Sequence, residues 1–219
     1  MNNNRLKLVI FDKDGLIMDT EKPVFNVWRE VLSQRGLSAF TREHYTRFIG
    51  FSRNQNIVQL SELYPEVDCA ELFEACSVSV KQYIDNNPID TMPGLLELLD
   101  LLDNMRIKKA VATSSRRHNA EITLKKCDIF HRFDVVISGD MVENSKPAPD
   151  IFLKAAEIMK VSPGECLVLE DSPAGVRAAH AAGIPVIVVP DMVKPSDEIL
   201  SLCECRCDSL HDVVKYLSL

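Results

Sequence analysis

The chain has 219 residues, of which 46% are hydrophobic and 26% are charged, and its formal net charge at pH 7 is −7. This composition is typical of a compact globular protein and excludes a disordered chain, while the negative charge argues against partners such as nucleic acid or an acidic membrane surface. No stretch approaches about 20 apolar residues and the first residues are polar, so we expect no membrane-spanning helix, no signal peptide and a cytoplasmic location.

The first predicted element is a short buried strand that ends in two acidic residues. Residues 8–11 are apolar, Gly15 breaks the strand, and Asp12 and Asp14 lie two positions apart. In an extended backbone these two side chains point the same way, and Lys13 points away from both, toward a cap or solvent. Two close carboxylates repel each other unless a cation joins them, and Mg²⁺ prefers such oxygen ligands. A carboxylate can also attack a phosphoryl group while its neighbour moves the proton, although an Asp pair at a strand end can equally serve only the turn.

Helical patterns, with no convincing strand, follow this first element. Apolar residues recur at helical spacing in residues 24–35, 41–49, 55–63 and 69–83. Four helices inserted between the first two strands of a sheet would form a lid over that sheet. The sequence therefore predicts a helical cap, after which residues 88–94 return the chain to the core.

Helices and strands alternate regularly in the remainder of the chain. Helices are predicted at residues 94–104, 117–126, 149–159 and 173–182, and strands at residues 108–113, 133–138, 165–170 and 185–189. Such alternation predicts an α/β fold with a parallel sheet that is covered on both faces and joined by right-handed crossovers.

Three of the later segments place polar residues at the end of a strand or the start of a helix. Thr113 and the next two residues end one strand, Lys146 lies between serine and proline ahead of a helix, and Glu170 and Asp171 end another strand. In open parallel sheets, ligands bind at the carboxyl ends of the strands. Each group also has a simpler explanation, because hydroxyls and acids often cap helices and most lysines are exposed.

The seven cysteines, an odd number, are spread through predicted strands and helices, as is usual for reduced thiols rather than a disulfide framework. Cys203, Cys205 and Cys207 alternate as in a last short strand. A soft-metal site there is the weaker alternative, because the spacing is too short and no second pair lies nearby.

Four ordered motifs together resemble those of the haloacid dehalogenase-like hydrolase superfamily. They are D-K-D-G…D-T from Asp12, T-S-S from Thr113, S-K-P-A-P-D from Ser145 and L-E-D-S-P-A-G from Leu169. The local sequence is most similar to the branch with β-phosphoglucomutase and sugar-phosphate phosphatases. This resemblance implies a Rossmann-like parallel-sheet core, formed by residues 1–19 and 91–219, with an inserted four-helix cap domain at residues 20–90.

The resemblance also implies roles for the motif residues. Asp12 would be the nucleophile, Asp14 the general acid and base, and Thr113 and Lys146 would hold the phosphoryl oxygens. The cofactor would be Mg²⁺, bound by the Asp12 carboxylate, the Asp14 main-chain carbonyl and Asp171, with Glu170 as a direct or water-mediated ligand. Residues that match or flank the substrate loop of this branch are expected to bind substrate, namely Gly50, Arg53, Asn56, Ser114 and Arg116.

The expected function is Mg²⁺-dependent hydrolysis of a small phosphorylated metabolite, in the first place a sugar phosphate, by a monomer. A phosphosugar mutase is the alternative, but the mutase has a histidine in its first cap helix where this chain has Val24. A phospho-ligand sensor without turnover is a further alternative. The presence of all the motif acids argues against it, because a sensor would be expected to lose Asp12 or Asp14. The natural substrate and a role for Lys13 do not follow from the sequence.

Overall fold

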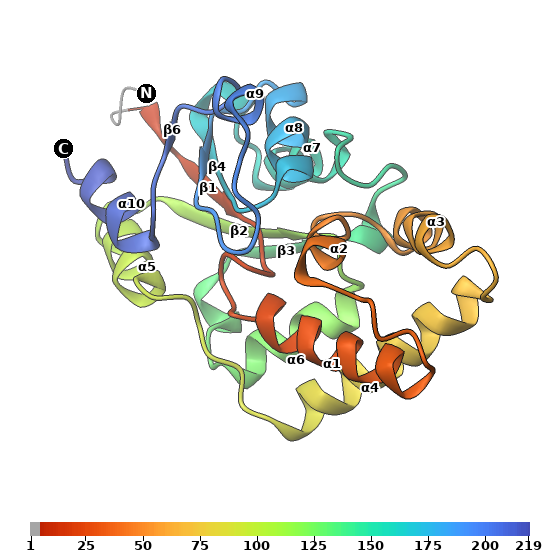
Figure 1. Ribbon diagram of the computed structural model, residues 1–219. Helices are drawn as coiled ribbons and strands as arrows, with labels where there is room; N and C mark the ends of the chain where they lie inside the picture. The colour runs from red at the N-terminus through yellow and green to blue at the C-terminus, as the bar shows by residue number, and fades with distance from the viewer. Residues whose placement is uncertain (1–4) are drawn as a thin grey trace.

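The computed structural model describes residues 5–219, and its centre is a sheet of six parallel strands in the order β3-β2-β1-β4-β5-β6 (Figure 1). The parallel α/β core predicted from the alternation is confirmed. The strands are β1 (Leu8–Phe11), β2 (Lys108–Thr113), β3 (Val135–Ser138), β4 (Cys166–Glu170), β5 (Val186–Val188) and β6 (Cys205–Arg206).

Helices cover both faces of the sheet because the central strand alternates its side chains between two apolar clusters. Leu8 and Ile10 point into one cluster and Val9 and Phe11 into the other, and all four side chains are fully buried. The first cluster is closed by α7 (Asp150–Met159), α8 (Pro173–Ala181) and α9 (Asp197–Leu200), and the second by α5 (Leu95–Asn104), α6 (Arg117–Lys126) and α10 (Leu210–Leu217).

Four helices lie between β1 and α5 and share an apolar cluster of their own (Figure 1). At its centre Trp28 packs against other aromatic rings, with ring centroids 5.5 Å from Phe48 and 5.4 Å from Phe73. Met192, from the loop after β5, also packs into this cluster. This separate cluster is consistent with a cap domain, whose boundaries at residues 20 and 90 stay a prediction. The helices are α1 (Glu21–Gln34), α2 (Arg42–Thr46), α3 (Arg53–Leu63) and α4 (Cys69–Asn86).

Several element boundaries differ from the predicted ones. The first cap helix begins at Glu21, before the expected residue 24, and the second ends at Thr46 rather than at residue 49. Two helices after β5, α9 and α10, were not predicted. The second of these has a recognisable pattern, because Leu210, Val213 and Leu217 at helical spacing are buried and Ser209 caps the first turn.

All seven cysteines are free thiols. Cys203 packs with the cluster under α7 and α8, whereas Cys205 and Cys207 pack with the cluster under α5 and α10. Residues two apart in a strand lie on the same face, as Cys205 and Cys207 do. Cys203 precedes β6 and packs on the opposite face, so the predicted strand does not extend to it.

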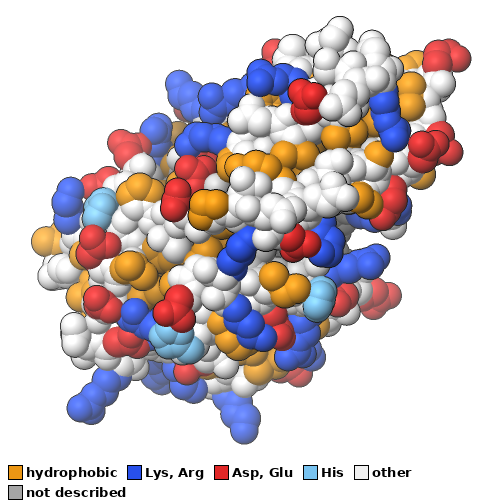
Figure 2. Space-filling model, turned by 90° about the horizontal axis from the view of Figure 1, so that it is seen from below, with side chains coloured by type: hydrophobic (Ala, Val, Ile, Leu, Met, Phe, Trp, Pro, Cys, Tyr) orange, Lys and Arg blue, Asp and Glu red, His pale blue; other side chains and the backbone are white. Residues whose placement is uncertain are grey.

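Charged side chains of both signs are interspersed over the face that Figure 2 shows, with hydrophobic side chains exposed between them. No large surface of a single charge is visible on this face. Within residues 5–219, no helix is both long enough and apolar enough to cross a membrane.

Candidate active site

The middle strands of the sheet bring three of the predicted site residues together. Asp12 follows β1, while Thr113 and Glu170 are the last residues of the two neighbouring strands, β2 and β4. The Asp12 amide continues the ladder by donating to the Leu169 carbonyl at 3.0 Å. The exposed fractions of Asp12, Thr113 and Glu170 are 7%, 1% and 0%. Parallel pairing thus gathers two acids and a hydroxyl at the carboxyl edge, as the sequence predicts.

Lys146 enters this group from the loop ahead of α7. Its side chain is only 1% exposed, and its ammonium donates to Asp12 Oδ1 at 2.5 Å and to Glu170 Oε1 at 2.6 Å. Burial alone would lower the pKa of Lys146, but the two carboxylates raise it above its usual value. The structure therefore excludes the alternative of an exposed surface lysine and places a fixed positive charge beside Asp12.

Ser172, rather than Asp171, caps the helix that follows β4. The Ser172 hydroxyl accepts from the Gly175 amide at 3.1 Å, which is the capping bond of α8. The other oxygen of Glu170, Oε2, accepts from the Ser172 amide at 2.7 Å and from its hydroxyl at 2.9 Å. Both Glu170 oxygens thus have protein partners, while Asp171 is left out of the cap.

Asp171 is buried with one carboxylate oxygen unpaired. Its exposed fraction is 2%, and Oδ2 has no hydrogen-bond partner in the described chain. Gly15, in the turn after β1, makes room for this oxygen: its φ is +81°, and a Cβ there would lie 2.5 Å from Asp171 Oδ2. An unpartnered buried carboxylate oxygen is costly unless something binds it.

The donor set around Asp171 fits a magnesium ion. Asp12, Glu170 and Asp171 each offer an oxygen atom, and these atoms lie within 4.8 Å of one another. Burial raises the pKa of Asp12 to about 7, against the opposing effect of Lys146, and it raises the pKa of Asp171 well above its usual value, with Glu170 and Asp12 adding to the effect. A cluster of buried acids with hard oxygen atoms is a suitable site for Mg²⁺.

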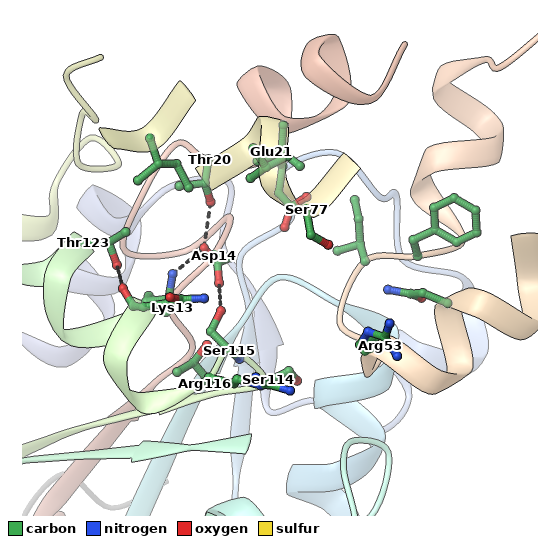
Figure 3. A pocket seen from close by; sticks show the side chains of 18 of the residues that line it. Lys13, Asp14, Thr20, Glu21, Arg53, Ser77, Ser114, Ser115, Arg116 and Thr123 are labelled. Atoms are coloured by element: carbon green, nitrogen blue, oxygen red, sulfur yellow. Dashed lines mark hydrogen bonds and ion pairs between the residues drawn. The ribbon is translucent and has the colours of Figure 1, made fainter. Parts of the chain in front are cut away.

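Lys13 does not point away from the aspartates, contrary to the prediction. Its side chain is 4% exposed, and its ammonium donates to Asp14 Oδ1 at 2.6 Å. The strand ends at Phe11, so the alternation of side chains does not extend through this turn. Thr20 donates to the same oxygen at 3.0 Å, and Ser115 donates to Oδ2 at 3.2 Å (Figure 3).

These three donors orient Asp14 and favour its carboxylate form. Burial would raise the pKa of Asp14, but the Lys13 ammonium and the hydrogen bonds from Lys13, Thr20 and Ser115 bring it below its usual value. Lys13 therefore has a definite neighbour, for which the sequence contained no usable signal, because its contact depends on the shape of the turn.

A cavity lies between the sheet edge and the cap. Its volume of about 620 Å³ is within the range of small-molecule binding sites. Asp12, Asp14 and Asp171 lie at one end of it. Val24, at the position of the mutase histidine, lines this cavity. The cavity wall also includes all of the predicted substrate-binding residues, namely Gly50, Arg53, Asn56, Ser114 and Arg116.

The Gly50 loop of the cap closes directly against the core. Gly50 has a φ of +83°, and a Cβ there would lie 2.6 Å from the Ser172 hydroxyl. The Ser114 hydroxyl donates to the Gly50 carbonyl at 3.4 Å. Both the backbone conformation and the lack of space therefore require glycine at this position. Gly50 contributes to the site by letting the cap loop approach Ser172 closely.

Glu21 is a cavity residue to which the sequence gave no role, although it follows the D-T pair of the first motif. It is 8% exposed, and the Tyr45 hydroxyl donates to its Oε2 at 2.7 Å. Burial, with the charge of Asp14 nearby, raises the pKa of Glu21 to about 8. Near neutral pH this side chain is thus predominantly a neutral carboxylic acid that can both donate and accept hydrogen bonds.

Replacing Glu21 with Gln is expected to make stability less dependent on pH. Between pH 4.5 and about 8 the folded wild type retains a proton that the unfolded chain loses, so its stability falls as pH rises through this window. The variant has no carboxyl group to titrate, so its unfolding free energy should exceed that of the wild type by about 2 to 4 kcal/mol at pH 8.5, with little difference at pH 4.5. Urea unfolding at both pH values measures these free energies. A difference between variant and wild type that is the same at both pH values would refute the prediction.

Gly175 is expected to be intolerant of alanine because it lies against Glu170. An added Cβ would be 1.6 Å from Glu170 Oε1, the oxygen that accepts from Lys146. Gly175→Ala should therefore cost about 1 to 3 kcal/mol of unfolding free energy and lower activity by displacing Glu170. Gly164→Ala is the matched control, since nothing lies within 4 Å of its Cβ position. Equal unfolding midpoints for the two variants would contradict this packing.

Comparison with known proteins agrees with this geometry. The family model described as haloacid dehalogenase-like hydrolase matches residues 9–189. The phosphorylated carbohydrates phosphatase of Thermotoga maritima is 35% identical over 179 residues, which cover 82% of each chain. The β-phosphoglucomutase of Bacillus subtilis is 33% identical over 186 residues, which cover 82% of this chain and 81% of that protein.

Solved structures are similar along nearly the whole chain. The crystal structure of CbbY from Rhodobacter sphaeroides in complex with phosphate has a TM-score of 0.80 at 25% identity, covering 98% of this chain and 100% of that one. The β-phosphoglucomutase of Clostridium difficile has a TM-score of 0.81 at 25% identity, covering 97% and 96%. The resemblance inferred from the four motifs is confirmed, and the chain belongs to the haloacid dehalogenase-like hydrolase family as one of its phosphatases.

Proposed function

We propose that this phosphatase hydrolyses small phosphomonoesters, in the first place sugar phosphates, through an aspartyl-phosphate at Asp12 and with Mg²⁺ as cofactor. The observation that carries the proposal is the buried Asp12 carboxylate, hydrogen-bonded to the Lys146 ammonium at 2.5 Å at the end of the cavity. The similarity to a phosphorylated carbohydrates phosphatase supports the substrate class.

The chain's own groups divide the chemistry among them. Lys146 holds Oδ1 of Asp12, which leaves the other carboxylate oxygen to attack phosphorus, while Thr113 and the Lys146 ammonium hold phosphoryl oxygens. Asp14 is a carboxylate in the free site, and the negative charge of a bound phosphomonoester favours its protonated form, which gives the proton to the leaving oxygen. In the second step the Asp14 carboxylate takes a proton from the water that hydrolyses the aspartyl-phosphate. Lys13, Thr20 and Ser115 keep the Asp14 carboxylate in place for both transfers.

Mg²⁺ would be held by the carboxylates of Asp12 and Asp171 and by the Asp14 main-chain carbonyl. When bound, it supplies positive charge to the phosphoryl oxygens and compensates the buried acids. Glu170 would act mainly by orienting Lys146 and Ser172, because both of its oxygens already accept hydrogen bonds from these residues. The unpaired Oδ2 of Asp171 supports this assignment.

A β-phosphoglucomutase-type reaction is the alternative, supported by the 33% identity to the enzyme of Bacillus subtilis. Against it, Val24 lines the cavity at the position where the mutase has a histidine, and valine cannot move a proton. A phospho-ligand sensor is less well supported, because the buried acids, the lysine and the cavity are all present.

The proposal is tested by phosphate release from a panel of sugar phosphates and other phosphomonoesters, with Mg²⁺ and with excess chelator. We expect Mg²⁺-dependent release, and glucose 1-phosphate should give free glucose rather than glucose 6-phosphate. Conversion to glucose 6-phosphate with little release would support the mutase. Binding of phosphate esters without either reaction would support the sensor.

A further inference from the structure

We infer that the part of the cavity distant from Asp12 selects an uncharged, hydroxyl-bearing leaving group and disfavours a second phosphate, and that Glu74 is a specificity-determining residue. This inference rests on the proposed function and narrows its substrate class to monophosphates of polyhydroxylated carbon chains.

The cationic side chains in this part of the cavity already have anionic partners. Arg53, which the sequence suggested for a distal phosphate, lies 3.6 Å from a Glu74 carboxylate oxygen, and its guanidinium lies 5.6 Å from the centre of the Phe73 ring. Lys81 lies 2.5 Å from a carboxylate oxygen of Asp85. All of these residues line the cavity. A second phosphate group would therefore have to separate one of these two ion pairs, or else bind beside the carboxylate of the pair.

The two other cations of the cavity wall, Lys13 and Arg116, lie toward the phosphoryl end, where Lys13 contacts Asp14. Arg116 is the N-cap residue of α6 and directly follows Ser115, whose hydroxyl contacts Asp14. Figure 3 shows Arg116 beside Ser114 and Ser115, whereas Arg53 lies apart from the group around Asp14. Arg116 thus lies on the same side of the cavity as Ser115 and Asp14, and Arg53 and Lys81 are the distal cations.

An uncharged polar group on the same helix as Arg53, Asn56, matches a hydroxyl group instead. Asn56 lines the cavity with an exposed fraction of 9%, and its buried Oδ1 has no hydrogen-bond partner in the described chain. A hydroxyl can donate to Asn56 Oδ1, whereas a phosphate dianion offers only acceptors and would leave it unpaired.

Electrostatics lead to the same conclusion. Glu74 and Asp85 stand in this part of the wall against Arg53 and Lys81. A phosphate group with a charge of about −1.5 to −2 at pH 7 would meet carboxylates at least as numerous as the cations, whereas a neutral polyol meets no such opposition. Glu74 is central because it occupies the guanidinium that a distal phosphate would otherwise bind.

The first test compares matched substrates with the Mg²⁺-loaded enzyme. Fructose 1-phosphate is paired with fructose 1,6-bisphosphate, and glucose 6-phosphate with glucose 1,6-bisphosphate. We expect kcat/KM for each monophosphate to exceed that for its bisphosphate by about tenfold or more. Bisphosphates that react as well as the monophosphates would overturn the inference but leave the proposed function standing. Failure of the proposed function would be a distinct result, in which neither the monophosphates nor the bisphosphates are hydrolysed.

The second test assigns the selectivity to Glu74. In Glu74→Gln, Arg53 loses its anionic partner, so the ratio of kcat/KM for the bisphosphate to that for the monophosphate should rise by about three- to fivefold. Glu62→Gln is the matched control, since Glu62 is an exposed residue of α3 outside the cavity wall and its variant has the same net charge. A ratio unchanged in Glu74→Gln, or raised equally in both variants, would overturn the role of Glu74.

The third test concerns the hydroxyl acceptor. Asn56→Leu removes the amide at similar size, and we expect it to lower kcat/KM for fructose 1-phosphate by about three- to tenfold relative to p-nitrophenyl phosphate, whose leaving group has no further hydroxyl. A general loss of structure would lower both values together. An unchanged ratio of the two values would show that Asn56 does not recognise a hydroxyl.

Discussion

Replacing Asp12 with Asn is expected to abolish phosphate release, lowering kcat by a factor on the order of 10⁴ to 10⁶. The amide is nearly the same size but is a poor nucleophile, so the aspartyl-phosphate cannot form. Asp12 also accepts from Lys146 at 2.5 Å, and an amide oxygen can keep this hydrogen bond, so the fold should be retained. The measurement is kcat for the best substrate of the panel at saturating Mg²⁺.

The control for this substitution is Asp128→Asn, which makes the same chemical change where the side chain is 99% exposed. It should have the activity of the wild type. Because Asp12 is also a proposed metal ligand, acid-quenched turnover of the wild type should show a phosphoryl group on the peptide that contains Asp12. Residual activity within about tenfold of wild type in Asp12→Asn, or phosphorylation at another residue, would contradict a nucleophilic role.

Replacing Lys146 with Met is expected to affect both stability and activity. The substitution leaves the carboxylates of Asp12 and Glu170 buried without their common cation, which should cost about 3 to 5 kcal/mol of unfolding free energy without Mg²⁺. Activity should fall by about 10² to 10³, because a charge that stabilises the phosphoryl oxygens is lost. Urea unfolding with and without Mg²⁺ and kcat with a sugar phosphate measure the two effects.

Mg²⁺ should restore part of the stability lost in Lys146→Met, since the ion compensates the same carboxylates. Lys154→Met is the matched control on α7, because its side chain is 40% exposed and pairs with Glu157 at the surface. This control should differ from wild type by about 1 kcal/mol or less. If the two variants were equally stable without Mg²⁺, Lys146 could not be the counter-charge of the buried acids.

The sequence by itself determined the α/β core and most of the proposed catalytic group. The strands that carry Asp12, Thr113 and Glu170 are apolar runs ended by polar residues, and such runs can be recognised locally because parallel strands are buried on both faces. Parallel pairing then brings their carboxyl ends to one edge without further information. The four ordered motifs were enough to identify the family that the comparisons confirm.

Only the tertiary structure decided what the polar side chains contact. Lys13 reaches Asp14, and Ser172 caps α8 in place of Asp171, because turn geometry rather than residue spacing orients these groups. Glu21 became a cavity residue when α1 began earlier than its apolar pattern indicated and Tyr45 packed against it. Arg53 is paired with Glu74 across two cap helices, a contact between residues far apart in sequence that depends on how those helices pack.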